Sequence, residues 1–115
     1  MNGKAIWTVA LAPWLAGAAP LDEETRRDVR CFILVAQLSG SEDPALRDAG
    51  RIGSQYFLGR IDGRAPGLDL EAVMVAEADA AIADRKALFP YCGDLMKKRG
   101  AEVEAIGNRL AARGI

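Results

Sequence analysis

The sequence predicts an all-α protein, a compact bundle of four helices with one inter-helix disulfide. Half of the 115 residues are apolar, alanine and leucine dominate, and β-branched residues are few. That composition favours helix over strand. A chain of this length has room for one domain. We therefore expect a signal peptide over residues 1–18 and a single helical domain over residues 19–115.

The N-terminal segment has the features of a secretory signal. Lys4 supplies a positive charge, residues 5–21 carry none, and Ala16-Gly17-Ala18 has the small-residue form that signal peptidase cleaves. A retained membrane anchor and a buried first helix are the alternatives. The apolar run is shorter than the roughly 20 residues of a spanning helix and contains Pro13. We expect a cleaved signal, a periplasmic protein and no stable membrane span after cleavage.

A first helix is predicted over about residues 22–39. Asp22 suits the N-cap, and Glu23 and Glu24 place negative charge at the positive end of the helix dipole. Apolar residues then surround most of its C-terminal half: Val29, Cys31, Phe32, Ile33, Leu34, Val35, Ala36 and Leu38. A helix of this kind is expected at the centre of a bundle.

A second helix is predicted over about residues 44–62, with Asp43 as N-cap and Pro44 at the first helical position. Its helical period is carried by Leu46, Ala49, Ile52, Gly53, Tyr56, Phe57 and Ile61. A glycine inside a helix is unfavourable by roughly 1 kcal/mol relative to alanine. Gly53 lies beside the apolar stripe, which predicts close approach of a neighbouring helix.

The last two helices are predicted over about residues 69–88 and 91–112. Asp69 is the expected N-cap of the first of them, and Phe89-Pro90 is the expected break between the two. The final helix is expected to face the core with five apolar side chains: Leu95, Met96, Val103, Ile106 and Leu110.

The two cysteines, Cys31 and Cys92, predict one disulfide in a small exported chain. The bond would close a loop of about 60 residues and would stabilise the fold by roughly 4 kcal/mol in the chain-entropy model. Two free thiols are the alternative, with the pKa of Cys92 lowered by a nearby helix N-terminus. Without histidine or a CxxC spacing, a structural bond is the preferred interpretation.

Composition argues against several function classes. The chain has no histidine, which excludes histidine-based acid–base catalysis and histidine-containing zinc sites. Loss of residues 1–18 removes Lys4 and leaves 14 basic against 16 acidic residues, a net charge of −2. Nucleic-acid binding needs clustered positive charge, and no such cluster is present. We therefore expect no enzymatic activity, no cofactor, no metal site and no nucleic-acid partner.

The segment from Tyr56 to Gly63 is the most distinctive part of the sequence. Its structural interpretation is core packing followed by a capped helix end. Its functional interpretation is a contact surface near the turn that follows the second helix, formed by Tyr56, Arg60, Asp62 and Arg64.

The chain also resembles small periplasmic disulfide-bonded helical proteins. The resemblance rests on Cys31 in an early helix, on a helix end with Tyr56, Gly59, Asp62 and Gly63, and on Cys92 near the start of a late helix. HdeA-type acid-stress chaperones, Tai-type immunity proteins of type VI secretion and other exported alphaproteobacterial proteins share this plan. The chain has one cysteine pair where the immunity proteins have two, and it lacks the chaperone's lysine-rich tail. Only the disulfide between Cys31 and Cys92 carries over.

This resemblance implies a function in protein binding. We expect a non-enzymatic periplasmic protein that binds unfolded clients, as an HdeA-like stress chaperone would. The alternative is an immunity or inhibitor protein that binds one specific partner. The sequence leaves open whether the protein works as a homodimer.

Overall fold

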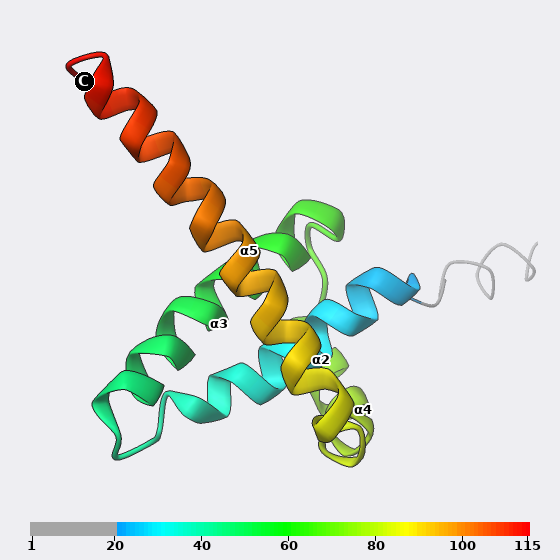
Figure 1. Cartoon of the computed structure of the whole chain (residues 1–115). Helices are drawn as coiled ribbons and strands as arrows, with labels where there is room; N and C mark the ends of the chain where they lie inside the picture. Colours follow the sequence, from blue (N-terminus) through cyan, green and yellow to red (C-terminus); the bar gives the residue numbers. More distant parts are fainter. Residues whose placement is uncertain (1–20) are drawn as a thin grey trace, which may run out of the picture.

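The computed structural model describes residues 21–115 and contains four helices, with no strand in that range (Figure 1). The predicted all-α fold is confirmed. The helices are α2 (Glu23–Leu38), α3 (Pro44–Arg64), α4 (Leu70–Ala83) and α5 (Arg85–Ala112). The predicted signal peptide, residues 1–18, lies outside the described residues.

Three predicted aspartate N-caps are confirmed. The carboxylates of Asp22, Asp43 and Asp69 accept backbone hydrogen bonds from the first turns of α2, α3 and α4. The bond from Thr25 to Asp22 is the chief reason that the pKa of the Asp22 carboxyl lies below its ordinary value. A carboxyl with a lowered folded-state pKa stabilises the fold above its unfolded pKa. That contribution is lost as the pH falls through the folded-state pKa.

Helix α2 lies at the centre of the fold, as predicted, and contacts all three other helices. Its buried side chains form two clusters on different sides of the helix. Val29 and Leu34 pack with Ile61 of α3 and Ala81 of α4. On the other side, Val35 packs with Phe57 of α3 and with the disulfide. Burying an aliphatic or aromatic side chain of this size contributes about 1.5–3 kcal/mol to the free energy of unfolding. Because both clusters contain side chains of α2, the core is built around this helix.

The predicted disulfide is present and joins the central helix to the last one. Cys31 of α2 and Cys92 of α5 are both fully buried, and their Cα atoms lie 5.6 Å apart. No free cysteine exists among residues 21–115. The bond therefore holds α5 against α2 from inside the core.

The boundary between the last two helices differs from the prediction. It lies at Asp84, not at Phe89-Pro90, and Pro90 is inside α5. The backbone oxygen of Asp84 accepts a hydrogen bond from the backbone nitrogen of Leu88, and this bond belongs to the first turn of α5. Proline removes one hydrogen bond, to the carbonyl of the exposed Lys86, where water can replace the missing donor. Packing of Leu88 and burial of Cys92 hold the helix against α2 on both sides of the proline.

The predicted inner face of the last helix is only partly correct. Leu95 and Met96 are half-buried and pack on the core. Beyond them, α5 extends away from the other helices (Figure 1), and every residue from 103 to 115 is exposed. The exposed apolar side chains of this segment include Val103, Ile106 and Leu110. Leu46 and Ile52 of α3 are likewise exposed, although the helical spacing of the apolar residues in this segment predicted that they would be buried.

Two glycines of α3 lie where no side chain fits. A Cβ added at Gly53 would be 2.5 Å from Val35 Cγ1 and 2.6 Å from Met96 Cε, which confirms the predicted close approach. A Cβ at Gly50 would be 2.4 Å from the backbone nitrogen of Ser39. Backbone cannot move aside as a flexible methionine can, so Gly50 is the less replaceable of the two.

Gly50→Ala is expected to lower the free energy of unfolding by about 1–3 kcal/mol, because the methyl group would push α3 away from the end of α2. Gly59→Ala is the matched control in the same helix, since nothing lies within 4 Å of its Cβ position. That variant should be more stable by about 0.5–1 kcal/mol through helix propensity. Urea unfolding followed by circular dichroism measures both changes. Equal changes in the two variants would contradict the steric explanation.

Candidate protein-binding surface

A buried carboxylate ties α2 to α3. Asp28 of α2 is fully buried, and its two oxygens accept from different arginines of α3. Arg60 Nε donates to Oδ1 at 3.0 Å, and Arg64 Nη1 donates to Oδ2 at 2.9 Å. Arg64 also pairs with Glu24, at 2.8 Å. The two arginines are four residues apart and therefore lie on one face of α3.

Tyr56 extends this network by one more turn of α3. Its hydroxyl accepts from Arg60 Nη1 at 3.2 Å, and the guanidinium carbon lies 5.7 Å from its ring centroid. Burial acts to lower the pKa of Arg60, but the hydrogen bonds and charges of Asp28 and Tyr56 outweigh it and raise that pKa. Arg60 is thus held as a cation between the two groups.

The structure brings together three of the four residues of the predicted contact surface. Tyr56, Arg60 and Arg64 share one face of α3. Asp62 is exposed, and a two-residue step turns it about 200° away from Arg60. The arginines face Asp28, so their primary interactions are inside the fold. Sequence reasoning missed Asp28, although an aspartate within the apolar stripe of the first helix was the available signal.

Other charged side chains of α2 link it to α4. Glu77 forms an ion pair with Arg26 at 3.1 Å and accepts a hydrogen bond from Arg30 at 2.8 Å. These ion pairs are partly buried and join α2 to α4. Among residues 21–115, no group of three or more cysteine, aspartate or glutamate side chains could hold a metal ion.

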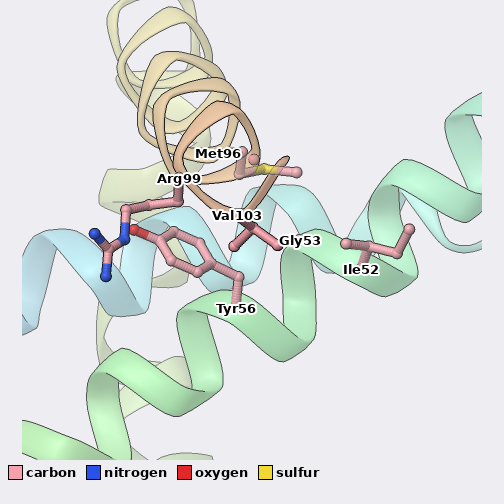
Figure 2. A pocket seen from close by; sticks show the side chains of 7 residues that line it. Ile52, Gly53, Tyr56, Met96, Arg99 and Val103 are labelled. Carbon is pink, nitrogen blue, oxygen red and sulfur yellow. The ribbon is translucent and has the colours of Figure 1, made fainter. Parts of the chain in front are cut away.

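An apolar hollow lies between α3 and α5 (Figure 2). Its volume is about 330 Å³. Met96 lies close to Gly53, and the ring of Tyr56 and the side chain of Arg99 lie at one side of the hollow, with Ile52 at the other. Arg99 is the single charged residue of the lining, which consists of Ile52, Gly53, Tyr56, Met96, Arg99, Gly100 and Val103. The hollow can therefore accept an apolar side chain of another molecule.

The lining of the hollow continues along the exposed part of α5. Val103 lines the hollow and is 68% exposed, and Ile106 and Leu110 follow it at 47% and 39%. Spacings of three and seven residues place all three on one side of the helix. We call Val103, Ile106 and Leu110 the α5 stripe. The α5 stripe and the hollow form one continuous apolar surface.

The described helices are all too short or too polar to cross a membrane.

No protein-family model matches the chain, and no curated protein or solved structure matches it significantly.

Proposed function

We propose that this protein is exported to the periplasm and acts there, without catalysis, by binding other proteins. The signal features of residues 1–18 support export. The disulfide between Cys31 and Cys92 supports it independently, because such bonds persist in oxidising compartments.

The observation that carries the proposal is the hollow between α3 and α5. It is apolar and open to solvent, and it is bordered by the exposed Ile52 and Val103. Exposed apolar surface that continues into a concavity marks protein-binding sites. The single charged residue of its lining, Arg99, is paired with Glu102, which leaves hydrophobic contact as the main source of binding energy.

Unfolding clients are the first proposed ligands, as for an HdeA-like stress chaperone. Such clients expose apolar side chains, and the hollow accepts them without requiring a particular sequence. The purified protein should suppress the aggregation of a heat-labile enzyme, measured by light scattering at neutral and acidic pH. Ile52→Asp should lose at least half of this suppression, because it places a charge at the edge of the hollow.

Val75→Asp is the matched control for that experiment. Val75 is 76% exposed, against 69% for Ile52, but it lies on α4, away from the hollow. This variant should suppress aggregation as well as the wild type does. Wild-type protein that leaves scattering unchanged at every pH would refute the client-binding proposal. Equal suppression by both variants would place client binding elsewhere.

One specific partner, as for an immunity or inhibitor protein, is the second candidate. Tyr56 and Arg99 beside the hollow favour it, because tyrosine and arginine contribute much of the binding energy of specific interfaces. It predicts a complex of fixed stoichiometry with the product of a neighbouring gene, measured by size-exclusion chromatography with light scattering. Arg99→Ala should weaken that complex at least tenfold.

A further inference from the structure

The exposed half of α5 has a heptad pattern. Met96, Val103 and Leu110 are seven residues apart, and Ile106 lies three residues after Val103. In a two-helix coiled coil, such positions form the seam between the helices. In the single chain this seam is half-covered at Met96 and open from Val103 onward. The exposed half of α5 therefore has a seam that no other helix within residues 21–115 covers.

The two flanks of the α5 stripe differ in chemistry. Glu102 and Arg109 lie along one flank, seven residues apart, and carry opposite charges. Gly100 and Gly107 lie along the other flank, also seven residues apart, and nothing lies within 4 Å of the Cβ position of either. Glu102 pairs with Arg99 on its own helix, whereas Arg109 makes no ion pair within residues 21–115.

We infer that a second copy of this chain covers the α5 stripe, with its own α5 antiparallel to the first. In the antiparallel register that places Val103 of each copy against Ile106 of the other, the charged flanks meet. Glu102 of each copy then lies opposite Arg109 of the other. Two equivalent ion pairs, related by a twofold axis, therefore form between the copies. A parallel arrangement would instead place the charged flank of each copy against the glycine flank of the other, and neither ion pair would form.

The remaining positions fit the same register. Leu110 of each copy meets Arg99 of the other, whose aliphatic stem can cover it while the guanidinium reaches water. On the second flank, Gly100 faces Gly107, and the absence of side chains lets the two backbones approach closely. The register also matches the length of the helix. Ala112, the last residue of α5, falls opposite Lys97, next to the point where Met96 contacts Gly53 of α3.

Charge variants of the purified full-length protein test this arrangement, with mass measured by sedimentation equilibrium. The wild type should approach twice the mass of the monomer as its concentration rises. Glu102→Arg and Arg109→Glu should each raise the dissociation constant at least tenfold, because each places two pairs of like charges at the interface. Ile106→Asp should abolish dimerisation. Circular dichroism confirms that each variant is folded.

Mixing provides the decisive measurement. An equimolar mixture of the Glu102→Arg and Arg109→Glu variants restores both ion pairs, so it should form heterodimers that neither variant forms alone. The double variant Glu102→Arg/Arg109→Glu should return to homodimers. Glu104→Arg is the matched control, since it makes the same charge change away from the seam and should leave the mass unchanged. A monomeric wild type, or no recovery on mixing, would overturn the inference.

This inference does not require the proposed function. Sedimentation reports the association of two copies, whereas light scattering reports the binding of other proteins. A protein that dimerises without suppressing aggregation would retain the inference and lose the chaperone proposal. Suppression by a monomeric wild type would do the reverse.

Discussion

Replacing both Arg60 and Arg64 by alanine is expected to lower the free energy of unfolding by about 3–5 kcal/mol. That is the typical effect of leaving a buried charge without its partner. Asp28 is fully buried, and the two arginines donate to its two oxygens. In the double variant, the carboxylate would remain inside the fold with neither cation. Denaturant unfolding, followed by circular dichroism, measures the change.

Three further variants separate this effect from a general loss of side chains. Arg64→Ala alone should have a smaller effect, because Arg60 still donates to Asp28. Asp28→Asn, added to the double variant, should recover part of the lost stability, because it removes the buried charge and keeps the shape. Arg51→Ala/Lys86→Ala removes two exposed cations and should change stability by no more than about 0.5 kcal/mol. A loss below about 1 kcal/mol in the arginine double variant would refute this explanation.

Loss of the disulfide is the second large effect that we expect. Cys31 and Cys92 are 61 residues apart in the sequence. Removing a cross-link of that span lowers the free energy of unfolding by about 4 kcal/mol in the chain-entropy model. A domain of this size has a total stability of about 5–14 kcal/mol. The reduced protein should therefore lose more than a quarter of its stability.

The structure also predicts where the reduced protein loosens first. Without the bond, α5 is held to α2 mainly by Leu88, Tyr91 and Leu95, whereas α2 and α3 keep the Asp28 network. Amide hydrogen exchange should therefore accelerate more in α5 than in α2 or α3 after reduction. The variant Cys31→Ala/Cys92→Ala should reproduce this pattern and should not respond to reductant. Uniform acceleration across all four helices would contradict the expected order.

Much of the fold could be predicted from local sequence. The N-caps at Asp22, Asp43 and Asp69 depend on residues within three positions of each other, so they can be recognised from the sequence alone. The central place of α2 follows from its nearly continuous apolar surface. The disulfide between Cys31 and Cys92 follows from the presence of two cysteines in a chain with an export signal.

The candidate binding surface was less accessible to sequence reasoning. Periodicity identifies which residues share a face of a helix, but it does not say whether a neighbour covers that face. Val103, Ile106 and Leu110 have the pattern of core residues, yet no other described helix covers them. Ile52 is exposed for the same reason. The hollow arises where the exposed and covered parts of one apolar face meet.

Local sequence is enough to predict the helical class, the starts of α2, α3 and α4, and the covalent link, because these depend on short-range chemistry and on the cysteine count. Three other features follow only from the three-dimensional packing: the helix boundary at Asp84, the pairing of Asp28 with Arg60 and Arg64, and the exposure of the α5 stripe. Each of these depends on groups more than thirty residues apart, or on the absence of a covering helix. Long-range packing determines these features, and local helix propensity contains no information about that packing.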